Sequence, residues 1–168
     1  MIVREAGRDD GDFLADMLVA AVNWSPEWKK QSRRRVLAAP NTAHYIAGWP
    51  REDDLGVVAE VDGERVGAAW LRFFPPEEPG YGFVAADVPE LTIGVAAPWR
   101  GRGVGRTLLR ALEARAVEAG IRRIGLSVER KNFAQRLYLA EGYEIVGAGS
   151  ADSDTMVKDL TGGTFPGK

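Results

Sequence analysis

The chain has 168 residues, of which 45% are hydrophobic and 27% charged, and it contains no cysteine. One domain with a single core fits this length, whereas disorder throughout, disulfide scaffolds, thiolate metal sites and cysteine nucleophiles are excluded. The formal net charge of −2 at pH 7 argues against a chain built as a whole to bind nucleic acid.

The first part of the chain is expected to hold a short strand and two helices. Ile2–Arg4 has the pattern of a strand, and Asp10–Val22 places its apolar side chains on one helical face. A second helix is expected within Asn23–Trp49, beginning at Ser25-Pro26 and ending at Ala39-Pro40-Asn41. The side chains expected on its buried face are Trp28, Val36 and Leu37.

A β-hairpin is expected next. Gly56–Val61 and Arg65–Phe74 are rich in residues that favour strands, and Asp62-Gly63 between them suits the positive φ angles of a tight turn. The run Pro75–Gly80 contains three prolines, which cannot donate to a strand ladder, so this segment is expected to be a loop.

The second half alternates strands and helices. A strand is expected at Leu91–Ala96, a helix at Val104–Ala119 with Gly120 as its C-terminal stop, and a strand at Ile121–Val128. Asn132 is expected to cap a short helix that reaches Glu141. Two last strands follow at Tyr143–Val146 and Thr155–Leu160.

This order of elements indicates the α/β class, with a mixed sheet and helices on both faces. We expect one domain over residues 1–160 and a flexible C-terminal tail over residues 161–168. No apolar run reaches the roughly 18 residues of a membrane span, and charged residues fill Met1–Asp12 where a signal peptide is apolar. A cytoplasmic location without a membrane partner is therefore expected.

The turn that precedes Val104 is rich in glycine and arginine and joins a predicted strand to a predicted helix. The first amides of a helix lack partners within it and carry partial positive charge, so this geometry favours a bound anion. Gly101, Gly103 and Gly105 allow a ligand to approach the backbone closely. The sequence therefore predicts a phosphate-binding turn.

Two common phosphate-binding motifs do not fit this turn. A Walker A loop needs Lys followed by Ser or Thr, and its second glycine would fall on Arg106, five residues after Gly101. A dinucleotide fingerprint starting at Gly101 and Gly103 would need a small residue where Arg106 stands. A nucleotide triphosphatase and an NAD-binding unit are therefore disfavoured.

The pattern R-x-x-G-x-G, formed by Arg100, Gly103 and Gly105, resembles the acetyl-CoA motif of the GCN5-related N-acetyltransferase (GNAT) superfamily. The downstream run from Asn132 through Leu137-Tyr138 to Gly142-Tyr143 is similar to a second motif of that family. The resemblance implies a mostly antiparallel sheet of about six or seven strands with a splayed parallel pair. Family members often have a proline at the position of Ala97, whereas here Pro98 follows one residue later.

The resemblance also implies acetyl-CoA as co-substrate and no metal. The turn amides would hold the pyrophosphate, the guanidinium groups would add charge, and the first strand of the splayed pair would bind the pantetheine arm. The residues implied in coenzyme binding are Ile93, Gly94, Val95, Arg100, Gly101, Arg102, Gly103, Val104, Gly105, Arg106 and Asn132. For two of these residues a structural role is the alternative to coenzyme binding: Gly94 would allow close packing, and Asn132 would cap a helix.

The catalytic residues implied by the resemblance are Tyr138 and Glu90. Tyr138 would give a proton to the departing thiolate, and Glu90 would take a proton from the attacking amine. The alternatives are a packed tyrosine and a surface carboxylate. Since no cysteine exists, the amine would attack the thioester directly, and the Val95 amide would polarise the carbonyl.

We therefore expect an acyl-CoA-dependent N-acetyltransferase that acts on a primary amine, either a small molecule or a peptide. The alternative is a module that binds acyl-CoA, as a sensor or partner domain, with little catalysis. The segment 98–136 carries an excess of seven positive charges, but the negative total argues against nucleic acid. Four acids without a base in residues 74–90 favour a cationic acceptor. The sequence leaves a homodimer open.

Overall fold

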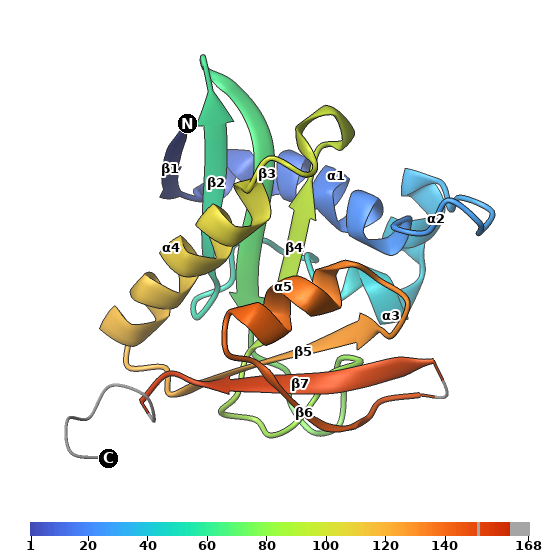
Figure 1. Cartoon of the computed structure of the whole chain (residues 1–168), viewed down its shortest axis with the longest axis vertical. Coiled ribbons are helices and arrows are strands. Elements are labelled where there is room, and N and C mark those ends of the chain that lie inside the picture. Colours follow the sequence, from blue (N-terminus) through green and yellow to red (C-terminus); the bar gives the residue numbers. More distant parts are fainter. Residues whose placement is uncertain (151, 162–168) are drawn as a thin grey trace. The chain divides into compact units, whose positions relative to one another are not determined.

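The computed structural model describes residues 1–150 and 152–161. Seven strands form one mixed sheet in the order β1-β2-β3-β4-β5-β7-β6 (Figure 1). The pairs β1–β2, β2–β3, β5–β7 and β6–β7 are antiparallel, whereas β4 and β5 are parallel. The predicted fold class is confirmed. The strands are β1 (Ile2–Glu5), β2 (Leu55–Val61), β3 (Glu64–Arg72), β4 (Glu90–Val95), β5 (Arg123–Glu129), β6 (Glu144–Ala148) and β7 (Ser153–Asp159).

The helices follow the predicted order except in one segment. They are α1 (Gly11–Val22), α2 (Arg33–Ala38), α3 (Pro40–Ala43), α4 (Val104–Glu118) and α5 (Ala134–Ala140), with short 3-10 turns at Arg8–Asp10 and Ala97–Trp99. Within the described ranges, none of these helices is long and apolar enough to cross a membrane.

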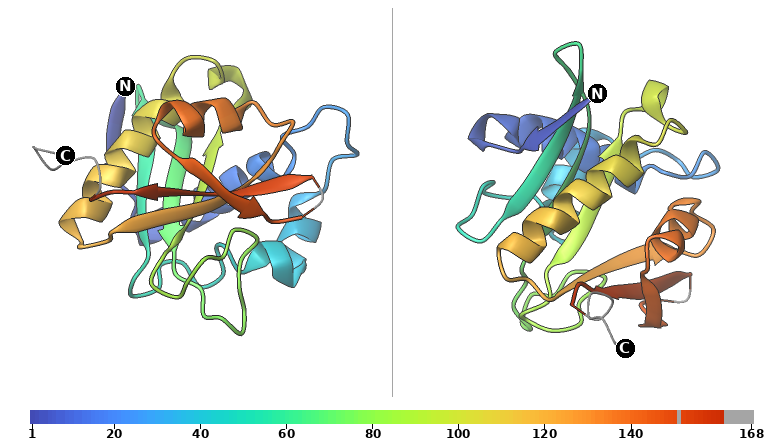
Figure 2. Two further views of the ribbon diagram at one scale, coloured as in Figure 1. Left: turned by 60° about the horizontal axis from the view of Figure 1, so that its bottom comes forward. Right: turned by 60° about the vertical axis from the view of Figure 1, so that its left-hand side comes forward.

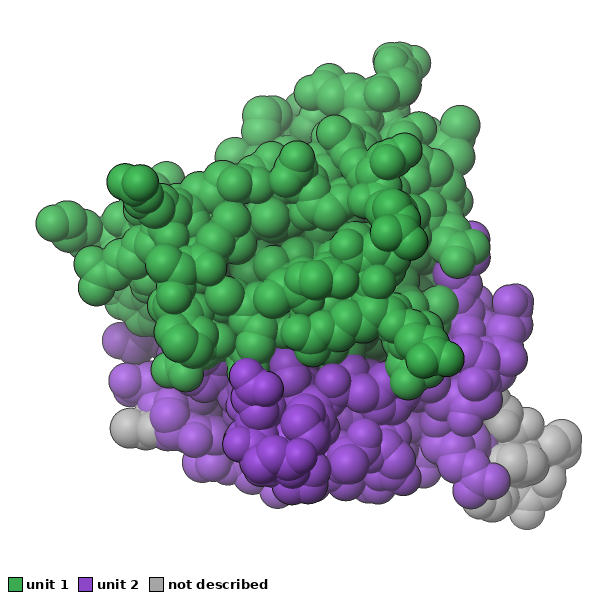
Figure 3. Space-filling model, turned by 180° about the vertical axis from the view of Figure 1, so that it is seen from behind, with its two compact units in different colours: residues 1–72, 92–112 green, residues 73–91, 113–168 purple. Residues whose placement is uncertain are grey.

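The chain forms two compact units (Figure 3). Unit 1 comprises Met1–Arg72 and Thr92–Leu112, and unit 2 comprises Phe73–Leu91 and Glu113–Lys168. The single domain expected over residues 1–160 stays a prediction. Of the expected tail, Thr161 is tied to Asp159 through its amide and hydroxyl, and residues 162–168 lie outside the described residues.

In unit 1, helices cover both faces of the strands β1 to β4. The hairpin turn is confirmed, since Asp62 and Gly63 have φ angles of 51° and 80°. Gly94 on β4 faces Met17 of α1, whereas Gly67 on β3 faces Leu108 of α4. Figure 2 shows α1 and α4 on opposite sides of these strands. The buried core of unit 1 includes Leu14, Leu18, Val58, Ala68, Trp70, Leu108 and Leu109.

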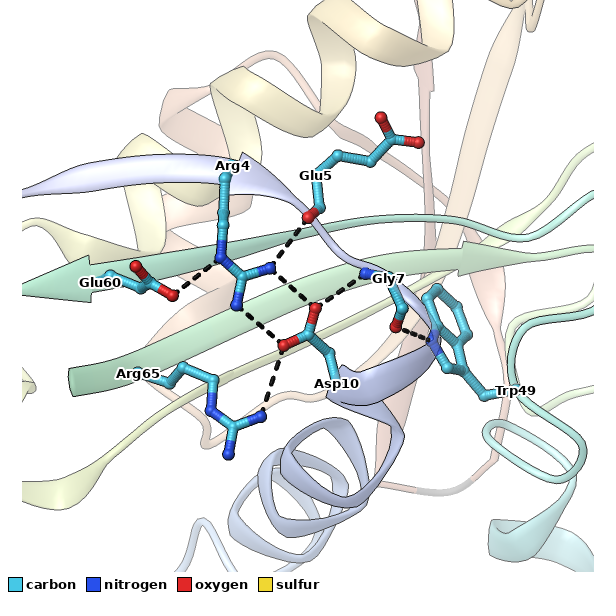
Figure 4. Close-up of polar contacts among 7 residues, drawn as sticks. All are labelled: Arg4, Glu5, Gly7, Asp10, Trp49, Glu60 and Arg65. Atoms are coloured by element: carbon cyan, nitrogen blue, oxygen red, sulfur yellow. Dashed lines mark hydrogen bonds and ion pairs between the residues drawn. The ribbon is translucent and has the colours of Figure 1, made fainter. Parts of the chain in front are cut away.

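A partly buried ion-pair network joins β1 to the start of α1 (Figure 4). Arg4 donates to both carboxylate oxygens of Asp10, at 2.8 and 2.9 Å, and its Nε donates to Glu60 at 2.8 Å. The Gly7 amide adds a hydrogen bond of 2.7 Å to Asp10. The hydrogen bond with Arg4 lowers the pKa of Asp10 to about 2. The network therefore favours the ionised carboxylate.

The single helix expected within Asn23–Trp49 is a wrong prediction. Ser25 accepts a hydrogen bond from the Glu27 amide in a local turn, and the first helix of the segment starts only after Ser32, which caps Arg35. Pro40 holds the preceding residue extended, so one helix ends there and another begins. Val36 is buried as predicted, Leu37 is half-buried and Trp28 is 50% exposed.

Unit 2 is built on the antiparallel pairs of β5, β7 and β6. β5 and β7 pair along their whole length, from Arg123 opposite Asp159 to Glu129 opposite Ser153. Gly120, with a φ of 82°, ends α4 just before β5 as predicted. The long loop before β4 packs on β5, since a Cβ at Gly82 would collide with the Leu126 backbone.

Candidate active site

In unit 1, part of the backbone of β4 points away from the neighbouring strand β3. The Ala96 amide donates to the Val66 carbonyl on β3 at 2.8 Å. Because successive backbone groups of a strand point to opposite sides, the Val95 and Ile93 amides and carbonyls point away from β3. The Arg100 Nε donates to the Val95 carbonyl at 3.2 Å, which agrees with this orientation.

Gly94, between these two residues, is required by close packing. A Cβ at this position would collide with the Met17 carbonyl oxygen and lie 2.9 Å from the Met17 Cβ. The strand can therefore approach α1 only with glycine here. Close packing against α1 therefore accounts for Gly94 within unit 1, while its role in coenzyme binding stays a prediction.

The turn from Arg100 to Gly103 leads directly into the fifteen-residue helix α4. Gly101 and Gly103 have φ angles of 74° and 82°, which favour glycine, and no atom lies within 4 Å of a Cβ built at either. Both are exposed. The glycines thus serve the backbone path of the turn and leave its outer side open.

The start of α4 has the geometry of an anion site. The Thr107 amide donates to the Gly103 carbonyl at 3.1 Å, and the first amides of the helix point toward the turn. Val104 is buried against the sheet and can offer only its amide. The side chains of Arg100, Arg102 and Arg106 are exposed around this turn. These donors fit a diphosphate.

Arg102 is positioned by an aromatic contact. Its guanidinium carbon lies 5.0 Å from the ring centroid of Trp99, a distance at which the ring face attracts a cation. This contact holds one charge of the turn next to the exposed glycines. Trp99 is therefore a supporting residue that the motif pattern alone did not single out.

In unit 2, Glu90 is held by the loop that precedes β4. The side chain is 2% exposed, and its Oε1 accepts a hydrogen bond from the Gly82 amide at 2.9 Å. A Cβ at Gly80 would collide with the Glu90 carboxylate. The alternative of a surface carboxylate is therefore wrong, because this loop folds over the side chain. The assignment of Glu90 as the base stays a prediction.

Tyr138 and Tyr143 lie close together in unit 2 but have different partners. Their ring centroids are 5.7 Å apart. The Tyr143 hydroxyl donates to Glu113 at 2.9 Å, and Glu113 also accepts from Lys158 at 2.8 Å. Burial raises the pKa of the Tyr138 phenol above its usual value, which keeps the proton on the oxygen. Tyr143 is thus engaged in a structural network, whereas the role of Tyr138 as the proton donor stays a prediction.

Asn132 precedes α5 rather than forming its N-cap, which is Phe133. Its Oδ1 accepts a hydrogen bond from the Ala134 amide at 2.9 Å, so the side chain does order the first turn of this helix. This local role accounts for the carbonyl oxygen of Asn132. Its contact with the coenzyme stays a prediction.

Several residues with a supporting role were not singled out by the sequence patterns. Met17 fixes the approach to Gly94 through its backbone, and Gly80 and Gly82 enclose Glu90. Their only signals in the sequence were an apolar helical position and glycines in a loop.

Residues 1–150 and 152–161 contain no group of three His, Asp or Glu side chains arranged to hold a metal ion.

The chain is similar in sequence and fold to known acetyltransferases. The profile of the Acetyltransferase (GNAT) family matches residues 18–143. A ribosomal-protein-alanine N-acetyltransferase from Brucella melitensis is 25% identical, with a TM-score of 0.69 over 95% of this chain and 99% of that one. No curated protein matches at a significant level.

Two further structures were solved with the coenzyme. The Salmonella typhimurium protein yncA, with its cofactor acetyl-CoA, is 20% identical, with a TM-score of 0.69 over 99% of this chain and 97% of that one. An N-acetyltransferase from Thermoplasma acidophilum in complex with coenzyme A is 19% identical, with a TM-score of 0.61 over 94% and 98%. The family match over residues 18–143 establishes that this chain belongs to the acetyltransferase (GNAT) family.

Proposed function

We propose that this protein transfers the acetyl group of acetyl-CoA to a primary amine by direct attack. The observation that carries the proposal is the exposed turn of Arg100 to Gly103 at the start of α4, whose open glycines and position at a helix N-terminus fit the pyrophosphate of coenzyme A. The structural neighbours solved with acetyl-CoA or coenzyme A support this choice of co-substrate.

In the proposed reaction, the backbone of β4 holds the pantetheine arm and the acetyl group. The Ile93 and Val95 amides point away from β3, where a ligand can pair with them as a further strand would. The Val95 amide would donate to the carbonyl oxygen as negative charge develops there. Gly94 keeps this stretch of strand close to α1.

The chemistry requires two proton transfers. The amine nitrogen attacks the thioester carbon, the carbon–nitrogen bond forms, and the carbon–sulfur bond then breaks. Glu90 accepts the proton that the amine loses, and Tyr138 donates its proton to the coenzyme A thiolate. The products are the N-acetylated acceptor and free coenzyme A. Burial raises the pKa of the Tyr138 phenol, so the phenol carries its proton at neutral pH.

The proposal is tested by measuring thiol release from acetyl-CoA with a panel of primary amines and with peptides that have a free amino terminus. We expect at least one acceptor to give release that depends on its concentration. The Glu90→Gln variant should lower kcat on the order of 10²-fold. Binding of acetyl-CoA without release for any amine would favour the acyl-CoA-binding module instead.

A further inference from the structure

The segment that runs from the loop after α1 into the first turn of α2 carries positive charge that the proposed reaction does not use. Five of the seven residues 29–35 are Lys or Arg, and residues 28–51 contain no Asp or Glu. Since the whole chain has a net charge of −2 and residues 29–35 carry +5, the residues outside 29–35 carry −7. We call these five exposed residues the basic cluster: Lys29, Lys30, Arg33, Arg34 and Arg35.

One member of the basic cluster is used to hold it in place. The Nε of Arg33 donates to Asp16 at 2.9 Å, and its Nη2 lies 3.6 Å from Asp12; both carboxylates are on α1. No ion pair links the four remaining cations to another residue in the described part of the chain. Their charge is therefore available to a partner, whereas that of Arg33 is compensated.

The loop that holds Lys29 and Lys30 and leads into α2 is closed by its own hydrogen bonds. The Asn23 side chain donates to the Gln31 carbonyl and accepts from the Gln31 amide, both at 2.9 Å. Ser32 then caps α2 by accepting from the Arg35 amide. In Figures 1 and 2 the segment stands out as a loop beyond the C-terminal end of α1. This closure fixes where the cations are displayed.

An exposed tryptophan lies next to the cations. Trp28 is 50% exposed, and its ring meets that of Trp24 edge to face with centroids 5.1 Å apart. The next residues along the chain line a hollow of about 470 Å³: Lys29, Lys30, Gln31, Ser32 and Arg35. Trp and Arg are the residues that most often dominate the binding energy of protein interfaces.

The loop also lies close to the strand expected to hold the acetyl group, within the same unit. Met17 on α1 touches Gly94 on β4. A helix rises 1.5 Å per residue, so the loop begins at Asn23 roughly 9 Å further along the α1 axis. An acceptor bound at β4 could therefore extend onto the basic cluster within a few residues.

We propose that Trp28 and the basic cluster bind an acidic polypeptide segment that follows the acceptor amine. This inference rests on the proposed function and names the acceptor class as a protein or peptide with Asp and Glu near its amino group. Arginine pairs with carboxylates in a fork, and lysine adds steering charge. A nucleic acid is disfavoured because four uncompensated cations are few for a polyphosphate and the rest of the chain is negative.

The test measures binding without catalysis. A peptide with a free amino terminus, acidic residues after it and a fluorescent label at its C-terminus is titrated with the protein, and anisotropy is recorded. The matched probe replaces each Asp and Glu by Asn and Gln. We expect the acidic peptide to bind and to weaken steeply with salt, and the amide peptide to bind at least tenfold more weakly.

The variant for this test replaces the four uncompensated cations: Lys29→Gln, Lys30→Gln, Arg34→Gln and Arg35→Gln. It should weaken binding of the acidic peptide by about tenfold or more. A control of equal charge replaces four exposed cations elsewhere, at Arg8, Arg51, Arg122 and Arg123, and should stay within about twofold. Trp28→Ala should weaken binding several-fold.

Three results would overturn the inference: equal binding of the two peptides, equal loss in the control variant, or tighter binding of an oligothymidylate than of the acidic peptide. Acetyl-CoA titration separates this inference from the proposed function. The basic-cluster variant should bind acetyl-CoA as the native protein does. If the native protein fails to bind acetyl-CoA, the proposed function fails whatever the peptides show.

Discussion

The two units offer different kinds of chemical group to the proposed reaction. In unit 1 the groups are backbone amides of β4 and of the α4 start, with exposed guanidinium groups around an open turn. In unit 2 they are two buried side chains, Glu90 and Tyr138. A charged coenzyme is bound well by exposed donors, whereas proton transfer needs side chains held in place beside the reacting atoms. Unit 1 should therefore govern affinity, and unit 2 should govern turnover.

The largest effect is expected from removing one oxygen in unit 2. Tyr138→Phe should lower kcat by about 10²-fold, because the thiolate then leaves without a proton donor, while the Kd for acetyl-CoA changes only a few-fold. Steady-state kinetics and calorimetry together measure both. The control is Tyr143→Phe, which loses the hydrogen bond to Glu113 and should reduce stability with little effect on kcat. Unchanged turnover in Tyr138→Phe would remove this role.

A smaller effect, on affinity, is expected from unit 1. Arg100→Ala should raise the Kd for acetyl-CoA by about tenfold, since one charge-assisted contact is lost, while kcat at saturating coenzyme stays near the native value. Titration calorimetry gives the Kd. A loss of kcat with an unchanged Kd would reverse the division of labour between the units.

Adding a methyl group at Gly94 tests how closely β4 approaches α1. Gly94→Ala places a Cβ against the Met17 backbone and should destabilise the fold by about 1–3 kcal/mol. Gly147→Ala is the matched control, because no atom lies within 4 Å of that Cβ, and it should stay within about 0.5 kcal/mol. Denaturant unfolding measures both. Equal stability of the two variants would contradict the close approach of β4 to α1.

The smallest effect is expected from the scaffold of unit 1. Asp10→Asn breaks the bidentate pair with Arg4 and should cost about 1–2 kcal/mol, since Arg4 is partly exposed. The pKa of Asp10 is lowered to about 2 in the fold. The stabilisation is therefore full above the unfolded value near 3.9 and is lost as the pH falls towards 2. Unfolding of native and variant proteins from pH 6 to 2 checks this, and an effect on kcat would contradict it.

The sequence predicted best where local signals agree with the tertiary structure. Asp62-Gly63 fixed the hairpin, and Gly120 marked the end of α4, since each position needs a positive φ. The turn from Arg100 to Gly103 was recognised because its spacing matched a family motif.

The rest depends on contacts between distant residues. The single helix expected in Asn23–Trp49 was a wrong prediction because two sets of contacts organise the segment. The Asn23 side chain forms two hydrogen bonds with the Gln31 backbone. Arg72, which is 1% exposed, bonds to Asp54 and to the His44 carbonyl. The burial of Glu90 likewise depends on Gly82, eight residues earlier in a loop without a periodic pattern. Such pairings leave no periodic trace in the sequence.

The central claim is that acetyl-CoA binds at the turn before α4, and calorimetric titration tests it most directly. The test variant is Arg100→Ala with Gly103→Trp. Its control is Arg51→Ala with Gly63→Trp, which also adds a tryptophan at an exposed glycine of positive φ with open space around it. The account predicts micromolar binding by the native and control proteins and none by the test variant. Binding by the test variant equal to that of the control would contradict it.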